Sequence, residues 1–328
     1  MNVVIYYPRP AAGGCERRIG DLGRWLLDNG DEAWLVCAGV TSDLAYTILC
    51  GQCGFPYHRI LQMPAGGTVE QWVVDQCREV KADILDVQWC HGIPDELPCA
   101  AVYTTHGLTQ PYPERHDFAG HIPVDKLPPH HGGRRFAPVW ETVYNWANLR
   151  RFPYQEKLGE GACFVGRSFK MGNVRRVAAR WSGIVDAYGI SAGNMEDLPA
   201  NVNWLGFSDP AQVIYGYRVV FASAQSALEG MAAGRLVIAG HEQGGYNSEA
   251  RLLTPANVEG LASRQFWHTG RSEAPGPDDE ALWRDFAVAM QCDFARERRQ
   301  LRAYVEREHD MDKQCRKIRR IYERCLQV

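Results

Sequence analysis

Residues 218–245 constrain the fold more than any other part of this sequence, because they predict a strand, a turn, a helix and a second strand. The apolar runs 219–222 and 236–239 have the length and composition of strands that are buried on both faces. Between them, good helix formers begin at Ser226, which places Glu229 in the expected first helical turn. Two such strands can become parallel neighbours only if the helix crosses back over the sheet. The stretch therefore predicts an α/β fold with a parallel sheet.

The same alternation of apolar strands and helical stripes runs through most of the chain. The expected strands are residues 3–7, 33–38, 58–61, 84–88, 100–105, 163–166 and 202–206. The expected helices are residues 16–29, 44–50, 69–80, 174–188 and 279–291, a short helix after Pro210, and a long charged helix from about residue 296 to 326. Residues 106–140 break the alternation, since proline, histidine and glycine dominate there, and we expect a long irregular segment.

A chain of 328 residues is long for one ordinary hydrophobic core. Because the α/β alternation occurs on both sides of the irregular segment, it predicts two Rossmann-like domains. We place an N-terminal domain at residues 1–150 and a C-terminal domain at residues 151–328, with the final helices packing back.

Composition excludes several classes of protein. A net charge of −3 and a charged fraction of 23% are typical of a soluble globular protein and give no global attraction to nucleic acid or membrane. Residues 1–10 read as a first strand, and no apolar stretch approaches the length that spans a membrane. Eleven scattered cysteines, an odd number, favour reduced thiols, so we expect a cytoplasmic protein.

Two features have alternative interpretations. Cys50 and Cys53 have the spacing of half a zinc site, which Cys90, His91 and Cys99 are the nearest residues to complete. No second Cys-x-x-Cys follows, so we favour buried thiols and predict no metal. The charged helix near residues 296–326 is typical of a solvated face, with peripheral contact to a lipid surface or to nucleic acid as the alternative.

Residues suited to binding a phosphate or a sugar follow several of the expected strands. In an open α/β sheet, ligands bind at the carboxyl ends of the strands. Glycines there allow close backbone approach, and an arginine near a lysine suits a diphosphate. Each candidate also has a structural interpretation, as a turn, a buried histidine, a solvated charge or a carboxylate that complements a helix dipole. The candidates are Gly13, Gly14, His106, Gly166, Arg167, Lys170, Ser226, Glu229, Gly244 and Gly245.

Several sequence motifs occur in an order that is typical of one enzyme superfamily. They are AAGGCERR, ADILDVQW, VYTTHG, VYNWANLRRF, CFVGRSFKMGN, NVNWLGF and LEGMAAGRLVIAG followed by a Gly-Gly pair. In this order they resemble the retaining GT-B glycosyltransferases, the superfamily related to glycogen synthase and to bacterial lipid and polysaccharide glycosyltransferases. The resemblance covers most of the chain. It implies the GT-B fold, in which two Rossmann-like domains face each other across a cleft.

The resemblance also implies roles for the candidate residues. Arg167 and Lys170 would bind the donor diphosphate and neutralise the leaving group. Glu229 would hold the donor ribose, and His106 would contact the sugar near the reaction centre. Such enzymes need no bound metal or other cofactor beyond the nucleotide-sugar co-substrate. The remaining donor-site residues that the resemblance implies are Gly13, Gly14, Gly166, Ser226, Gly244 and Gly245.

This sequence departs from the superfamily at two motifs. A first glutamate, which usually contacts the transferred sugar, is replaced by Phe221, eight positions before Glu229, and AQSA replaces the glycine-rich loop. In the interdomain motif, Trp146, Ala147 and Asn148 replace glycine, valine and aspartate. These departures leave the donor sugar unassigned.

The sequence thus predicts a metal-independent glycosyltransferase that moves a sugar from a nucleotide-activated donor with retention of configuration. A nucleotide-sugar epimerase and a catalytically silent nucleotide-binding scaffold are the alternatives. The acceptor is not specified, and a glycan, a lipid, a protein, a natural product and a nucleic acid base all remain open. We expect Arg134 and Arg135, within the segment rich in proline and histidine, to contact the acceptor.

Overall fold

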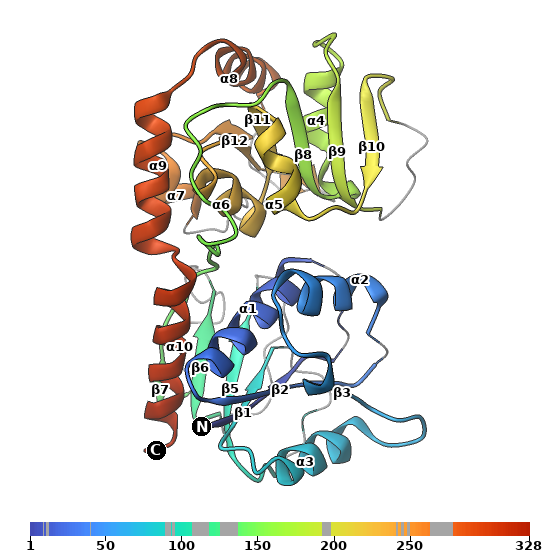
Figure 1. The fold of residues 1–328 in the computed structure, drawn as a ribbon, viewed down its shortest axis with the longest axis vertical. Coiled ribbons are helices and arrows are strands. Elements are labelled where there is room, and N and C mark those ends of the chain that lie inside the picture. The colour runs from blue at the N-terminus through green and yellow to red at the C-terminus, as the bar shows by residue number, and fades with distance from the viewer. Residues whose placement is uncertain are drawn as a thin grey trace. The chain divides into compact units, whose positions relative to one another are not determined.

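The computed structural model (Figure 1) describes residues 1–8, 10, 13–39, 41–88, 93, 96–106, 118–124, 137–191, 198–240, 242–243, 246–247, 250–262 and 278–328. These residues form two compact units. Unit 1 comprises Met1–Asn145 and Met311–Val328, and unit 2 comprises Trp146–Asp310. The ranges expected from sequence, 1–150 and 151–328, differ from these units by a few residues at the first boundary and by the last helix.

Unit 1 is built on a seven-stranded sheet in the order β3-β2-β1-β4-β5-β6-β7, and every neighbouring pair in it is parallel. The chain moves outward from β1 in one direction and, after β3, returns to β4 on the other side of β1. The carboxyl ends of β1 and β4 therefore form a topological switch point, where open α/β sheets bind ligands. The strands are β1 (Asn2–Tyr6), β2 (Glu32–Cys37), β3 (Ile60–Gln62), β4 (Ile84–Val87), β5 (Ala100–Thr105), β6 (Gly120–Pro123) and β7 (Val139–Trp140).

The helices of unit 1 cover this sheet. In α1, buried Ile19, Leu22 and Leu26 recur at helical spacing, and burial of each such side chain stabilises the fold by roughly 1.5–3 kcal/mol. The last helix, α10, packs against α1 and against β5, β6 and β7. The helices are α1 (Gly14–Asp28), α2 (Asp43–Tyr46), the π-helical η1 (Thr47–Gln52), the 3-10 turn η2 (Tyr57–Arg59), α3 (Val69–Glu79) and α10 (Met311–Cys325).

The expectation that residues 106–140 are irregular throughout is wrong, because β6 and β7 lie within this range. Both strands are short, and β6 contains a glycine and a proline, so local propensity does not predict them. They form because β5 offers a parallel edge to β6, with Thr104 opposite Ile122, and β6 pairs in turn with β7.

Unit 2 has a six-stranded sheet in the order β10-β9-β8-β11-β12-β15, which is parallel except for the antiparallel edge strand β15. Its switch point lies between β8 and β11. The strands are β8 (Ala162–Arg167), β9 (Val185–Ile190), β10 (Val202–Gly206), β11 (Val219–Ala222), β12 (Leu236–Ala239) and β15 (Arg251–Leu252), and a separate hairpin is formed by β13 (Glu242–Gln243) and β14 (Tyr246–Asn247).

Two helix pairs flank the sheet of unit 2. α4 packs against α8, and α6 packs against α9 (Figure 1). The helical elements are the 3-10 turns η3 (Ser168–Lys170) and η4 (Ile214–Gly216) and the helices α4 (Gly172–Ala178), α5 (Pro210–Val213), α6 (Ala224–Ala232), α7 (Val258–Ala262), α8 (Asp279–Gln291) and α9 (Ala295–Glu308).

The expected helix at residues 174–188 is wrong in its second half. α4 ends at Ala178, and the chain turns at residues 179–184 and then enters strand β9. In β9, buried Val185 and Ala187 alternate with the more exposed Asp186 and Tyr188. This period of two is the signature of a strand. It is obscured in the sequence because the apolar residues of the strand follow closely on the helical stripe.

The expected long charged helix is two helices, α9 and α10, which are interrupted at His309 and Asp310. The backbone amide of Ala147 donates a hydrogen bond to the carbonyl oxygen of His309 (2.9 Å), and Ala147 forms a parallel bridge with Asp310. The interruption therefore results from pairing with a distant segment.

Two arginines of α9 donate hydrogen bonds to backbone carbonyl oxygens within unit 2. Arg298, which is fully buried, donates to the carbonyl oxygens of Glu156 and Gly234, each at 2.9 Å. Arg302 donates to the carbonyl oxygens of Phe152 and Ala232, each at 2.7 Å. The guanidinium groups of Arg298 and Arg302 thus hold residues 152–156 against α9. These two side chains do not belong to the solvated face that we expected for the charged helix. Among the described residues, no helix is both long and apolar enough to cross a bilayer.

Candidate functional site

The candidate site in unit 2 lies where β8 and β11 end. The two strands are parallel neighbours, with Val165 opposite Ala222, so their carboxyl ends meet at one edge of the sheet. β8 continues into η3, and β11 continues into α6. The Nζ atom of Lys170 in η3 donates a hydrogen bond to Oγ of Ser223 in the β11–α6 turn (3.3 Å). This contact joins the two loops that flank the switch point.

A close approach between strands positions the end of β8. Gly189 in β9 has φ +151°, and a Cβ atom there would lie 1.6 Å from the carbonyl oxygen of Gly166. Only glycine allows this separation, because the obstructing atom belongs to the backbone. The next residue in β8, Arg167, is partly buried at the edge of the sheet, three residues before Lys170.

The start of α6 differs from the expectation. The helix begins at Ala224, with Ser223 as the N-cap in an extended conformation, whereas the sequence led us to expect a start at Ser226. The expectation that Glu229 lies in the first turn is therefore wrong. Glu229 lies in the second turn and is 1% exposed, and Ser226 is the partly buried third residue of the helix. Ser223 has a position that the sequence interpretation missed, although an N-cap serine after a buried strand is a recognised signal.

The electrostatic character of this edge favours an anion. Two side chains with fixed positive charge, Arg167 and Lys170, follow β8. The first turn of α6 adds the partial positive charge of backbone amides at a helix N-terminus. Arginine can donate two parallel hydrogen bonds to phosphate oxygens, and lysine supplies a compact charge. A diphosphate suits this arrangement.

Unit 1 has a related edge at the end of β1. Gly13 is the N-cap of α1, and Gly14 is its first residue. Three charged residues in the following turn, Glu16, Arg17 and Arg18, are almost fully buried. Charged groups are rarely buried unless they make specific interactions, so this turn has a role beyond solubility.

His106 follows β5 at the same edge of unit 1. Its Nε2 atom donates a hydrogen bond to Oε1 of Gln88, which follows β4 (2.6 Å). Burial and, to a smaller extent, the charge of Arg18 together lower the pKa of His106 to about 3. The imidazole is therefore neutral at physiological pH, and it can act there as a hydrogen-bonding group but not as a cation.

A buried cluster of polar groups, centred on the carboxylate of Asp86, lies near this edge. Asp86 in β4 accepts hydrogen bonds from the hydroxyl of Tyr322 in α10 (2.5 Å) and from Oγ1 of Thr104 in β5 (2.8 Å). Burial raises the pKa of Asp86 to about 6, although both hydrogen bonds and the charge of Arg18 oppose this rise. Burial also lowers the pKa of Arg18 to about 10. The cluster connects α10 to the centre of the sheet.

Sequence interpretation did not identify Asp86, Gln88 or Arg18 as site residues. A signal existed for Asp86, because a carboxylate inside the apolar run ILDV is unusual for a strand that is buried on both faces. Arg18 lies one helical turn after Gly14, one of the glycines that we selected. Nothing in the local sequence indicates that Tyr322 would reach Asp86 from more than two hundred residues away.

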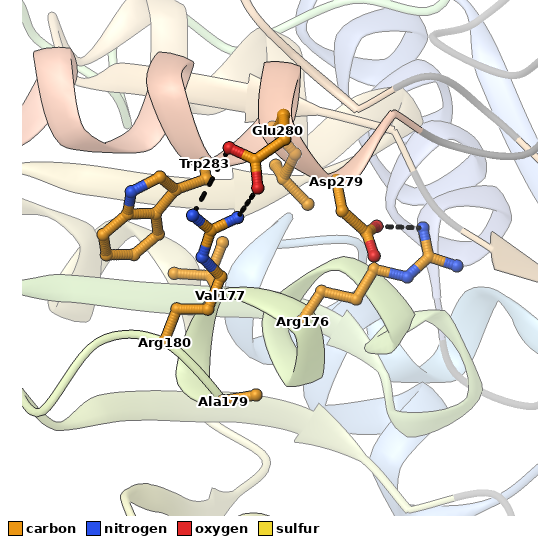
Figure 2. A pocket seen from close by; sticks show the side chains of 8 residues that line it. Arg176, Val177, Ala179, Arg180, Asp279, Glu280 and Trp283 are labelled. Atoms are coloured by element: carbon orange, nitrogen blue, oxygen red, sulfur yellow. Dashed lines mark hydrogen bonds and ion pairs between the residues drawn. The ribbon is translucent and has the colours of Figure 1, made fainter.

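A surface cavity of about 340 Å³ lies between α4 and the start of α8 (Figure 2). Its charged groups are paired across the two helices, Arg180 with Glu280 (2.7 Å) and Arg176 with Asp279 (3.5 Å). The guanidinium group of Arg180 also lies over the ring of Trp283, 4.8 Å from its centre. These contacts hold α4 against α8. The cavity adjoins the C-terminal half of α4, whereas Lys170 precedes the N-terminus of that helix.

Some predicted residues lie outside the described part of the chain, namely Gly244, Gly245, Arg134, Arg135, Cys90 and His91. Within that part, no three His, Cys, Asp or Glu side chains are gathered as the ligands of a metal ion would be. The described cysteines, which include Cys50, Cys53 and Cys99, form no disulfide with one another.

Comparison with solved structures finds glycosyltransferases that match this chain in fold. No protein-family model matches the chain, and no curated protein matches its sequence. A glycosyltransferase from Rickettsia africae ESF-5 matches in structure with a TM-score of 0.66 and 13% identity, over 99% of this chain and 98% of that one. An alpha-glucosyltransferase solved with UDP and a 13-mer DNA containing a HMU base matches with a TM-score of 0.57 and 11% identity, over 98% and 99% of the two chains. The glycosyltransferase VinC, solved with dTDP, matches with a TM-score of 0.54 and 12% identity, over 99% and 100%.

These matches span nearly the full length of both chains in each pair. The α/β fold that the sequence predicts is thereby confirmed: the chain has the GT-B fold, which it shares with these glycosyltransferases.

Proposed function

We propose that this chain is a glycosyltransferase and that unit 2 binds a nucleotide-activated sugar. The observation that carries the proposal is the hydrogen bond between Lys170 and Ser223, because it joins the loops after β8 and β11 at the switch point of a GT-B domain. The epimerase and scaffold alternatives receive no support from a specific feature of the structure.

The chemistry of sugar transfer explains why cations belong at this place. Negative charge develops on the leaving nucleoside diphosphate as its bond to the sugar breaks. Arg167 and Lys170 would stabilise this charge, and the first turn of α6 would add backbone amide donors. Stabilisation of a developing charge lowers the barrier more than equal binding of the ground state does.

Other residues keep the roles that the resemblance implies, as proposals. Glu229 would accept hydrogen bonds from the donor ribose, which would have to approach the second turn of α6. His106, as a neutral imidazole held by Gln88, would contact a sugar hydroxyl in unit 1. The other proposed donor-site residues are Gly13, Gly14, Gly166, Ser226, Gly244 and Gly245, and the proposed acceptor contacts are Arg134 and Arg135.

The finer features of the reaction are also proposals. We infer retention of configuration from the resemblance, together with independence of bound metal, since Arg167 and Lys170 would supply the positive charge. We also infer a cytoplasmic location from the cysteine content. Nuclear magnetic resonance of the product anomer, and turnover in the presence of a chelator, would test the first two.

The structural neighbours suggest the probes for a test of donor binding. Two of them were solved with UDP and with dTDP. Calorimetry with UDP, dTDP, GDP and ADP would measure affinity for the wild-type chain and for the variants Lys170→Met and Arg167→Met. Arg180→Met is the matched control, because it removes a cation of unit 2 that is already paired with Glu280.

We expect each of the two site variants to weaken binding by roughly tenfold or more, a loss that equals about 1.4 kcal/mol or more, whereas the control binds like the wild type. Hydrolysis or transfer of the matching nucleotide sugar should fall further, because these cations act most strongly on the developing charge. Absence of binding to all four nucleotides, or equal loss in the control, would refute the proposal.

A further inference from the structure

Two buried carboxamides in unit 2 lack the hydrogen bonds that buried polar groups normally make. Asn173 is 3% exposed, and neither its Nδ2 nor its Oδ1 atom has a hydrogen-bond partner in the described part of the structure. Gln225 is 4% exposed, and its Oε1 atom likewise has no partner there. Burial of such groups without partners destabilises a fold, so they call for an explanation.

Both carboxamides lie close in sequence to the hydrogen bond between Lys170 and Ser223, on which the proposed function rests. Asn173 is the second residue of α4 and follows Lys170 by three positions. Gln225 is the second residue of α6 and follows Ser223 by two. Lys170 and Ser223 are themselves hydrogen-bonded. The two amides therefore come from the two helices that begin on either side of one switch point.

Helical spacing shows which way these side chains face. Asn173 precedes Val177 by one turn, and Val177 is buried in the core between α4, α8 and the sheet. Gln225 precedes Glu229 by one turn, and Glu229 is also buried. Both amides thus lie on the inner faces of their helices, close to the edge of the sheet.

Elsewhere in the same unit the fold supplies hydrogen-bond partners to a partly buried amide. The Nδ2 atom of Asn201 donates to the carbonyl oxygens of Ala178, Trp181 and Gly183, at distances of 3.1, 2.6 and 3.1 Å. Asn201 precedes β10, so it lies at the amino edge of the sheet, opposite the candidate site. The unpartnered amides therefore occur at the edge where a ligand is expected.

The chemistry of a carboxamide indicates what it would bind. A diphosphate accepts hydrogen bonds only, and Arg167 and Lys170 already supply donors for it. A carboxamide both donates and accepts, as a hydroxyl group does. We propose that Asn173 and Gln225 recognise hydroxyl groups of the nucleotide-sugar donor, on the ribose or on the transferred sugar. This inference rests on the proposed function and assigns recognition to the last residue of the motif CFVGRSFKMGN, Asn173, and to Gln225 in the stretch AQSA.

The test uses replacements of similar shape, Asn173→Leu and Gln225→Met, in the full-length chain. Removal of an unpartnered buried amide should leave the melting temperature of the ligand-free protein unchanged or raise it. The same change should weaken binding of a nucleotide sugar about tenfold per variant. Asn201→Leu is the control, and it should lower the melting temperature without changing affinity. Asn173→Ala and Gln225→Ala serve as second variants if a larger side chain prevents folding.

Two ligands separate the two sources of hydroxyl groups. The nucleoside diphosphate that the wild type binds most tightly, among UDP, dTDP, GDP and ADP, carries only the hydroxyl groups of its ribose, or of deoxyribose in dTDP, and its glucose ester adds those of a sugar. Equal losses for both ligands assign the amides to the nucleoside diphosphate part that the two ligands share, and a loss confined to the glucose ester assigns them to hydroxyl groups of the transferred sugar. Wild-type affinity in all variants for both ligands would overturn the inference alone, whereas absence of binding by the wild type would refute the proposed function itself.

Discussion

The buried carboxylate of Asp86 makes a quantitative prediction about stability and pH. Its hydrogen bonds from Tyr322 and Thr104 and the charge of Arg18 favour the ionised form, but burial outweighs them and raises the pKa from 3.8 to about 6. For an acid whose pKa is raised on folding, the contribution to stability is fully present below the unfolded pKa and is lost as the pH rises through the folded value. Asp86 therefore stabilises unit 1 at acidic pH relative to neutral pH.

The size of this effect follows from the two pKa values. One pKa unit corresponds to about 1.4 kcal/mol, so the full difference amounts to ~3 kcal/mol, of which about 2 kcal/mol falls between pH 4 and pH 8. Asp86→Asn removes the titration but keeps the shape and can still accept from Tyr322. The free energy of unfolding of the variant relative to the wild type should thus rise by about 2 kcal/mol between pH 4 and pH 8.

Urea unfolding of both proteins at several pH values, followed by tryptophan fluorescence and by protease resistance of α10, would measure this difference. Other titrating groups, such as His106, largely cancel because both proteins contain them. Asp83→Asn, which removes an exposed carboxylate just before β4, is the matched control. A difference for Asp86→Asn that stays constant from pH 4 to pH 8 would refute the assignment of a raised pKa.

Two further predictions concern unit 2. Arg298→Met should destabilise unit 2 by roughly 3 kcal/mol or more, since it removes the donor to the buried carbonyl oxygen of Gly234 and the donor to the partly buried carbonyl oxygen of Glu156. The exposed Arg296→Met should change stability little. Chemical denaturation of the two variants checks this, and similar values would contradict it. Gly189→Ala should destabilise unit 2 by several kcal/mol, because the new Cβ atom would overlap the backbone of Gly166. Gly216→Ala is the control, since a Cβ atom there meets no atom within 4 Å. Equal melting temperatures for the two glycine variants would show that β8 and β9 separate more easily than the structure indicates.

Local pattern predicted most of the regular structure. The strands 219–222 and 236–239, the strand 100–105 and the helix 279–291 have the bounds that the sequence indicated. Apolar runs and helical stripes reflect burial on one or two faces, which is a local property of an element. Where pairing with a remote partner decides the structure, the prediction was wrong, as for β6, β7, β9 and the break between α9 and α10.

The candidate site was predicted only in part, for the same reason. Arg167 and Lys170 follow a recognisable strand, so their place at the edge of a sheet could be inferred from the chain. The partner of Lys170, Ser223, could not, because the contact depends on the adjacency of β8 and β11. Glu229 was selected as a candidate, but the start of its helix was placed two residues too late.

By itself, the sequence determined the α/β class, the order of most strands along the chain and the positions of the cationic and glycine-rich loops. Each of these depends on neighbouring residues, whose spacing is visible in one dimension. Only the tertiary structure decided which loops meet and that α10 belongs to unit 1 through Tyr322 and Asp86. It also decided that the amide of Asn173 and the Oε1 atom of Gln225 are buried without a hydrogen-bond partner among the described residues. Burial and hydrogen bonding between distant segments depend on how the sheets assemble, and no local pattern records that assembly.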